Sequence, residues 1–112
     1  MNLSTASRAL GALAQESRLG IFRLLIRAGD EGLAAGVIAH SLALPGSTLS
    51  AHLTILAHAG LITAERQGRS IRYRVDLAGT RRLFAFLMED CCRGRPELCQ
   101  PALEALLPQD CA

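Results

Sequence analysis

The spacing of apolar residues along the chain predicts helices first, then a β-hairpin, then a final helix. Apolar residues recur at intervals of three and four near the N-terminus, which indicates a first helix capped by Ser4 or Thr5. Its predicted apolar face consists of Leu3, Ala6, Leu10 and Leu13. A second helix is predicted over 17–28, with expected buried residues Leu19, Phe22, Leu24, Leu25 and Ile26.

Two further helical segments follow, and a tight turn separates them. The first spans 34–42, and its expected core residues are Val37, Ile38 and Leu42. After Ala43-Leu44-Pro45-Gly46, a helix over 47–59 is predicted to bury Leu49, Leu53, Ile55 and Leu56, with Gly60 in the left-handed position that ends such a helix. Short helices joined by a Pro-Gly turn, the second with Ser, Thr and His outside, are typical of a helix-turn-helix.

Apolar and polar residues alternate in the next two segments, 61–66 and 71–75, as in β-strands. The residues Gln67-Gly68-Arg69-Ser70 between them suit a hairpin turn, so this region is expected to form a wing. The last helix should begin near Leu77 and carry Leu83, Phe84, Phe86, Leu87 and Met88 on its apolar positions. The expected fold class is mainly α with a β-hairpin wing (α+β), a winged helix-turn-helix.

Length and composition indicate the number of domains and the cellular compartment. The 112 residues suit one domain, and none of the apolar runs approaches the length that spans a bilayer. The N-terminus Met1-Asn2-Leu3-Ser4 lacks the pattern of a secretory signal. A cytoplasmic protein with reduced thiols is therefore expected.

The distribution of charge says more than the net charge of +2. Between Leu61 and Arg82, six arginines stand against Glu65 and Asp76, a local balance of +4. From Glu89 onward, five acids outweigh two arginines, a balance of −3. A basic hairpin before an acidic tail is compatible with DNA binding and also with a simple solvated surface.

The candidate DNA contacts lie on the second helix of the helix-turn-helix and on the wing. On the helix they are Ser47, Thr48, Ser50, Ala51 and Thr54, with His52 on the flank. Helix capping is an equal alternative for Ser47, and a local hydrogen bond beside the core is an alternative for His52. On the wing, Arg69, supported by Arg66 and Arg72, is expected to meet a phosphate or enter the minor groove.

Three of the four cysteines lie within nine residues, in the segment CCRGRPELC. Arsenite prefers three thiolates, so the predicted ligand set for As(III), or for the related Sb(III), is Cys91, Cys92 and Cys99. Arg93 and Arg95 favour the thiolate form, and Cys111 is left out as a spare ligand. Methylarsenite, which needs two thiolates, is a further candidate.

Other chemistries fit the sequence less well. A structural zinc site normally uses Cys-x-x-Cys pairs, and the chain contains none. A redox switch that forms a disulfide such as Cys92 to Cys99 is the main rival, because arginine neighbours also favour a reactive thiolate. Neither a catalytic Ser-His-Asp or Cys-His pattern nor a phosphate loop is evident, so neither enzyme activity nor an organic cofactor is expected.

The phrases ALAQESRLGIFRLL, STLSAHLTILAHAGLI and ERQGRSIRYRV resemble the ArsR/SmtB family of bacterial repressors over about residues 8–90. The tail CCRGRPELC is similar to that of an arsenic-responsive subgroup whose thiols lie beyond the last helix. The resemblance implies a homodimeric winged-helix repressor that binds double-stranded operator DNA and leaves it when an inducer binds. It also implies that the controlled genes confer arsenic resistance.

Departures from other branches of that family limit the choice of inducer. The best-known arsenic repressors carry a Cys-x-Cys pair before the recognition helix, but 37–42 contains no thiol. Zinc-sensing relatives use Asp and His near the start of the last helix, and here Asp76 is present while Ala78 takes the place of the His. A zinc site of that kind is therefore not expected. Ala51 also stands where relatives often place Arg.

The predicted organisation is a DNA-binding and dimerisation domain over 1–90 and an inducer-binding tail over 91–112. The first and last helices offer a second apolar face, made by Leu10 and Leu13 with Leu83, Phe84 and Leu87. An apolar stripe of this kind indicates a dimer interface, although the same residues could complete a monomeric bundle.

Overall fold

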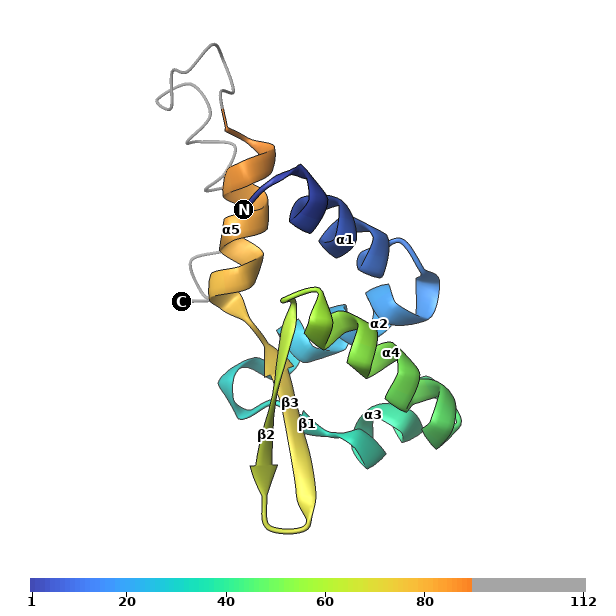
Figure 1. The fold of residues 1–112 in the computed structure, drawn as a ribbon. Helices are drawn as coiled ribbons and strands as arrows, with labels where there is room; N and C mark the ends of the chain where they lie inside the picture. Colours follow the sequence, from blue (N-terminus) through green and yellow to red (C-terminus); the bar gives the residue numbers. More distant parts are fainter. Residues whose placement is uncertain (90–112) are drawn as a thin grey trace.

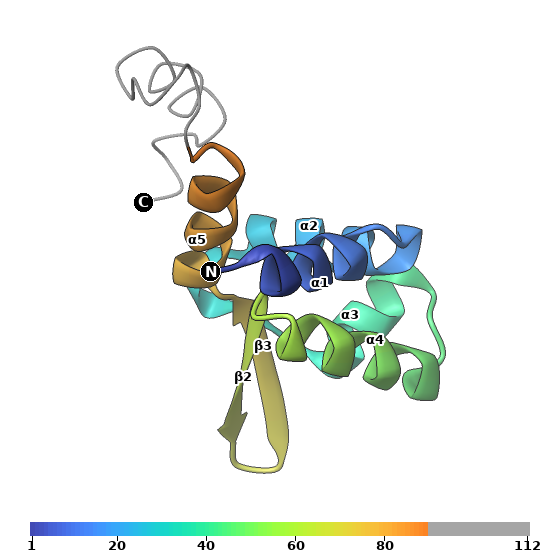
Figure 2. The same cartoon turned by 45° about the horizontal axis from the view of Figure 1, so that its top comes forward.

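The computed structural model describes residues 1–89, which form helices and one small antiparallel sheet. The elements in chain order are α1 (Leu3–Leu13), α2 (Glu16–Ala28), a 3-10 turn η1 (Gly29–Glu31), β1 (Leu33–Ala34), α3 (Ala35–Leu42), α4 (Gly46–His58), β2 (Ile62–Gln67), β3 (Ser70–Val75) and α5 (Leu77–Leu87). Helices α1 to α4 pack against one another, while α5 lies beside α1 (Figures 1 and 2). The β2–β3 hairpin extends away from the helices, which confirms the winged helix-turn-helix.

The sheet contains one strand that the sequence pattern does not reveal. Strands β2 and β3 pair in antiparallel register from Ile62 opposite Val75 to Gln67 opposite Ser70, as expected of a hairpin. The order is β1-β3-β2, because the two residues of β1 pair with the other edge of β3. Leu33 and Ala34 are too few to show an alternation of their own, so only their pairing with Tyr73 and Arg72 defines the strand.

Helix α1 begins earlier than predicted, and a different residue caps it. The side chain of Asn2 accepts a 2.9 Å hydrogen bond from the backbone N–H of Thr5, and Thr5 Oγ1 accepts one of 3.0 Å from the N–H of Asn2. This reciprocal pair is a capping box, so the prediction of a cap at Ser4 or Thr5 was wrong. Thr5 instead takes the third position of the helix.

The buried face of α1 is made of small residues rather than leucines. Ala6, Ala9 and Ala12 are almost completely buried, whereas Leu3 is 79% exposed and Leu10 is 42% exposed. Alanines let the helix axis approach its neighbours closely, and three-residue spacing keeps them on one side. The predicted face was therefore only partly right, because Leu3 and Leu10 lie outside the core while Leu13 packs against it.

The core joins α1 to α5 through a single cluster of apolar side chains. Its completely buried large members are Ile21, Leu25, Ile38, Leu49, Leu56, Leu61 and Leu83. Ile21 was not predicted, while Leu19, Ile26 and Val37 are more exposed than expected. Ile55 was also wrongly assigned to the core, because it lies ~100° around α4 from Leu56 and is 42% exposed.

The start of α5 is fixed against the end of α4. Asp76 caps α5 by accepting a 2.9 Å hydrogen bond from the N–H of Gly79, and its own N–H donates to the carbonyl oxygen of Leu61. Gly79 is buried, and a Cβ at this position would collide with the carbonyl oxygen of Gly60. Gly60 has a φ of +78°, which confirms its left-handed position after α4.

Candidate nucleic-acid interface

Helix α4 is anchored through one face and presents the other to solvent. Leu49, Leu53 and Leu56 are buried. On the opposite side are the predicted contact residues, which are all exposed: Ser47, Thr48, Ser50, Ala51 and Thr54. A helix whose outer face carries short hydroxyl side chains can approach closely to base edges and phosphates in a major groove.

The structure tests whether the first hydroxyl side chains of α4 cap the helix. Pro45 occupies the capping position, and no side chain there bonds to the helix N-terminus. Ser47 is already the second residue of the helix, so it does not cap it. Thr54 does use its hydroxyl locally, since its Oγ1 donates a 3.0 Å hydrogen bond to the carbonyl oxygen of Ser50. Helix capping is therefore excluded for Ser47 and Thr48, and a DNA contact remains a prediction for both.

His52 is partly buried on the flank of α4 and contacts another helix. Its Nδ1 lies 3.3 Å from the Nη1 of Arg18, which belongs to α2. The same guanidinium donates a 2.7 Å hydrogen bond from Nε to the carbonyl oxygen of Ala12, in the last turn of α1. The residues are 34 positions apart in sequence, so no local pattern predicts the contact. His52 therefore has a hydrogen-bonding partner beside the core, although not the local one that was considered, and a DNA contact through its other ring nitrogen remains a prediction.

The tip of the wing carries two exposed arginines. Gly68 and Arg69 form the two-residue turn between the paired residues Gln67 and Ser70, and Gly68 adopts a φ of +62°. Arg66 and Arg69 are both exposed, and the ion pairs of residues 1–89 include neither. A phosphate contact remains a prediction for both guanidinium groups.

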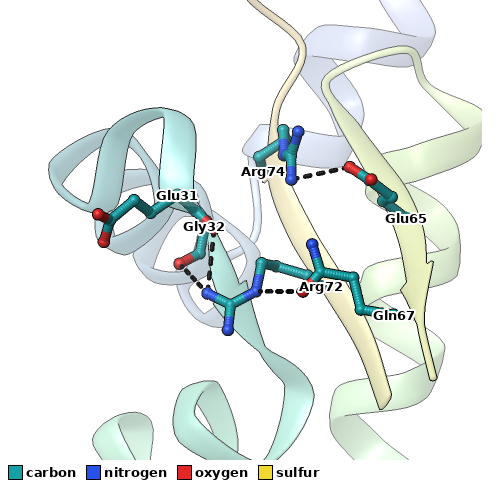
Figure 3. A network of polar contacts seen from close by, with 6 residues as sticks. All are labelled: Glu31, Gly32, Glu65, Gln67, Arg72 and Arg74. Atoms are coloured by element: carbon teal, nitrogen blue, oxygen red, sulfur yellow. Dashed lines mark hydrogen bonds and ion pairs between the residues drawn. The ribbon is translucent and has the colours of Figure 1, made fainter. Parts of the chain in front are cut away.

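Arg72, the third predicted wing contact, has a structural role as well (Figure 3). Its Nη1 donates to the carbonyl oxygens of Glu31 at 3.1 Å and Gly32 at 3.3 Å, and its Nε donates to Gln67 Oε1 at 3.3 Å. The guanidinium therefore joins the hairpin to the segment before β1. A contact with DNA remains a prediction for Arg72, but this side chain is less free than those of Arg66 and Arg69.

One arginine of the basic hairpin is neutralised by an acid on the same face of the sheet. Arg74 Nη2 lies 2.9 Å from Glu65 Oε2, and both residues are drawn in Figure 3. The Nε of Arg74 is buried and has no hydrogen-bond partner among the described residues. Of the remaining arginines in this region, Arg66 and Arg69 lie at the wing tip, while Arg81 and Arg82 are exposed on α5.

A groove between α1 and α5 is lined by several of the apolar side chains that lie outside the core. It has a volume of about 400 Å³, and Leu3, Leu10, Phe86 and Leu87 contribute to its lining. Leu83, which was expected to belong to this second face, is instead 2% exposed and part of the protomer core. Leu10 and Leu87 of the predicted face do line the groove, whereas Leu13 packs against the core.

The predicted thiol ligands Cys91, Cys92 and Cys99 lie outside the described residues, as does Cys111. Within residues 1–89, His, Cys, Asp and Glu side chains nowhere form a group of three that suits a metal ion. Asp76, the one residue of the chain that the family resemblance linked to a zinc site, caps α5. The described helices also include none with the length and apolar character needed to cross a membrane.

Comparisons with known proteins agree with this geometry. A family model described as a helix-turn-helix domain matches residues 13–65. A homodimeric winged helix-turn-helix DNA-binding domain from Mycobacterium bovis, described as a possible ArsR-family transcriptional regulator, is 30% identical, with a TM-score of 0.65 over 92% of this chain and 85% of that chain. No curated protein matches the chain.

Two other solved structures are similar. Reduced HlyU from Vibrio cholerae is 28% identical, with a TM-score of 0.62 over 80% of this chain and 90% of that chain. An ArsR-like transcriptional regulator from a Rhodococcus species reaches a TM-score of 0.70 over 95% of each chain. At 23% identity, this last likeness shows the fold alone.

Proposed function

Because the chain belongs to the ArsR family of winged-helix DNA-binding transcriptional regulators, we propose that it is a homodimeric repressor that releases its operator when trivalent arsenic binds to cysteine thiolates. The observation that carries the proposal is the place of the cysteine cluster in the sequence, directly after the helix that contributes to the uncovered apolar face. Cys91 follows Leu87, the last residue of α5, by four positions in the sequence. An inducer bound there would act next to the surface that we propose for dimerisation.

The DNA-binding part of the proposal rests on α4 and the wing. A recognition helix enters the major groove with its exposed residues, here Ser47, Thr48, Ser50, Ala51 and Thr54 with His52 beside them. Arg66 and Arg69 at the wing tip would neutralise phosphates on the flanking backbone. Because hydroxyls and alanine discriminate weakly among bases, most of the affinity is expected to come from backbone contacts.

Dimerisation is supported by the uncovered groove between α1 and α5. Leu3, Leu10 and Leu87 are each more than 40% exposed, and they lie on the same groove. Apolar side chains of this size grouped on one surface usually mark an interface. The similar domain from Mycobacterium bovis is described as homodimeric. A two-fold symmetric dimer would place one recognition helix on each half of an imperfect palindrome.

Arsenic is proposed as the inducer because of the donor set. Cys91, Cys92 and Cys99 provide three soft ligands within nine residues, and Arg93 and Arg95 favour their ionised form. Binding would favour a dimer whose recognition helices no longer match the half-sites. A coupling free energy of about 1 to 3 kcal/mol is typical of such linkage, and coupling is reciprocal, so operator DNA must weaken arsenite binding to the same degree.

A thiol redox switch is the alternative that the sequence and the comparisons favour next. Arginine neighbours make a thiolate reactive toward peroxide as well as toward metalloids, and a disulfide between Cys92 and Cys99 is within reach in sequence. One of the similar structures is that of reduced HlyU. In this version of the mechanism, oxidation rather than arsenic releases the DNA.

The two mechanisms are separated by a fluorescence-anisotropy titration of the reduced full-length protein on DNA from upstream of its own gene. Arsenite, antimonite, zinc, cadmium and peroxide are added in separate runs. Release by arsenite or antimonite supports the metalloid repressor, provided that a variant with Cys91 and Cys92 replaced by Ser no longer responds while Cys111→Ser still does. Release by peroxide alone supports the redox switch, and absence of DNA binding contradicts both.

A further inference from the structure

Arg18 of α2 contacts both α1 and α4, and its contact on α4 is His52, beside the exposed face of that helix. The backbone N–H of Arg18 donates a 2.8 Å hydrogen bond to Gln15 Oε1, which caps α2. Its Nε donates to the carbonyl oxygen of Ala12 at 2.7 Å, and its Nη1 lies 3.3 Å from His52 Nδ1. All three contacts are partly buried. The guanidinium is therefore held in a fixed position by α1 and α2 before it reaches α4.

The chemistry of the pair determines where the proton of the imidazole lies. A guanidinium group carries five N–H donors and has no acceptor. For Arg18 to donate to His52, the Nδ1 of the ring must therefore be unprotonated. A neutral imidazole has one N–H, so its proton must then be on Nε2. A doubly protonated ring would lose the contact and face a positive charge.

We propose that Arg18 is a positioning residue that fixes the Nε2–H tautomer of His52 and so makes the recognition helix a donor at this point of the DNA. The inference rests on the proposed function, in which α4 enters a major groove. The acceptors that an Nε2–H group can use in the major groove are a purine N7, guanine O6, thymine O4 and a phosphate oxygen. The amino groups of adenine and cytosine are donors, so they are not suitable partners for this tautomer.

This assignment gives His52 a specificity that its neighbours lack. Ser47, Thr48 and Ser50 carry hydroxyls that both donate and accept, so they tolerate several base edges. When Nδ1 of the imidazole accepts a hydrogen bond from Arg18, the ring can only donate, and only through Nε2–H. His52 is thus expected to select the position of an acceptor along the half-site, although it is only one residue among several on the helix.

The tautomer is tested directly by nitrogen-15 NMR of the imidazole in the full-length protein. We expect the wild type to show a protonated Nε2 and an unprotonated Nδ1 at His52. Arg18→Met keeps the apolar stem and removes the donor, so it should give a mixture of tautomers. Arg23→Met, an exposed arginine on the same helix, is the matched control and should leave the ring unchanged. A proton on Nδ1 in the wild type overturns the proposal.

The effect on recognition is measured with a duplex that the wild-type protein selects from random-sequence DNA. Arg18→Met should reduce the preference for this duplex over random DNA by about five- to tenfold, the worth of one hydrogen bond, while Arg23→Met should not. An unchanged preference in Arg18→Met overturns the inference. If the wild type selects no sequence at all, the proposed function itself fails, which is a distinct outcome.

Two further substitutions keep the test valid if Arg18→Met does not fold. His52→Gln places an amide N–H near the position of Nε2 and should retain most of the preference, whereas the shorter His52→Asn reaches only the position of Nδ1 and should lose it. The reverse order contradicts the proposal. Replacing half-site purines by their 7-deaza forms, guanines by 2-aminopurine, thymines by 4-thiothymine, or single phosphates by methylphosphonates then identifies the acceptor. If none of these replacements lowers the preference, His52 is removed from the DNA contacts.

Discussion

The guanidinium of Arg72 donates a 3.1 Å hydrogen bond to the carbonyl oxygen of Glu31, which precedes it by 41 residues (Figure 3). The contact fastens the hairpin to the turn before β1. Arg72→Ala should therefore lower the free energy of unfolding by about 1 to 2 kcal/mol, because Arg72 also bonds to Gly32 and Gln67. Urea denaturation followed by circular dichroism measures the change. Stability equal to that of the wild type would show that these bonds are replaced by water without cost.

Arg69 should behave in the opposite way, because it is exposed at the wing tip. Arg69→Ala is expected to leave the urea midpoint unchanged and to weaken binding to selected and random DNA alike. The dependence of binding on salt should become shallower by about one phosphate contact. Anisotropy titrations between about 50 and 200 mM salt, a range over which phosphate contacts make the affinity fall steeply, provide the slope. An unchanged slope removes Arg69 from the interface.

The proposed dimer makes a prediction about Leu10. Leu10→Glu places a charge in the groove between α1 and α5, so it should convert the dimer to a folded monomer at micromolar concentration. Val37→Glu is the matched control, because Val37 is similarly exposed, at 49% against 42%, but lies on α3 away from the groove. Sedimentation velocity distinguishes the species. A monomeric wild type, or a dimer that survives Leu10→Glu, would contradict the interface.

The thiol site makes a prediction that separates two arsenic species. Arsenite is expected to need three thiolates, and methylarsenite two. Cys99→Ser should then lose the response to arsenite and keep the response to methylarsenite, while Cys91→Ser should lose both. Release of labelled operator DNA is the measurement, with Cys111→Ser as the control. If Cys99→Ser responds normally to both species, only Cys91 and Cys92 bind the metalloid.

Ala43 is strained, and relief of that strain should stabilise the protein. It ends α3 with a φ of +53° and a ψ of +45°, in the left-handed region that residues other than glycine avoid. Ala43→Gly should raise the free energy of unfolding by about 0.5 to 1 kcal/mol after the larger entropy of the unfolded glycine chain is allowed for. A lower urea midpoint would mean that the Ala43 side chain makes a compensating contact.

Much of the fold could be predicted because its signals are local. The alternation in β2 and β3 and the turn at Gly68 are visible within a few residues, and so are the leucines that anchor α4. The capping box of α1 was missed because Asn2 lies before the first apolar repeat. Strand β1 was missed because two residues carry no period, and its only definition is the pairing with Tyr73 and Arg72.

The candidate site could be predicted less completely, because exposure depends on the whole fold. The exposed residues of α4 and the arginines at the wing tip were identified from helical and strand periodicity. The hydrogen bond from Arg72 to Glu31 and the contact between Arg18 and His52 join segments that are distant in sequence. Local residue spacing could therefore not predict them. The burial of the alanines on α1 was underestimated, because it reflects the close approach of helices rather than the hydrophobicity of alanine.

The close approach of Gly79 to Gly60 has a consequence for how a signal crosses the molecule. With no side chain between them, the first turn of α5 rests on the peptide that ends α4, and the bond from Asp76 to Leu61 locks the same junction. We therefore expect α4 and α5 to move together within a protomer. In a dimer assembled on α5, a small change in the crossing angle of the paired helices would swing the two DNA-reading ends apart without any internal rearrangement.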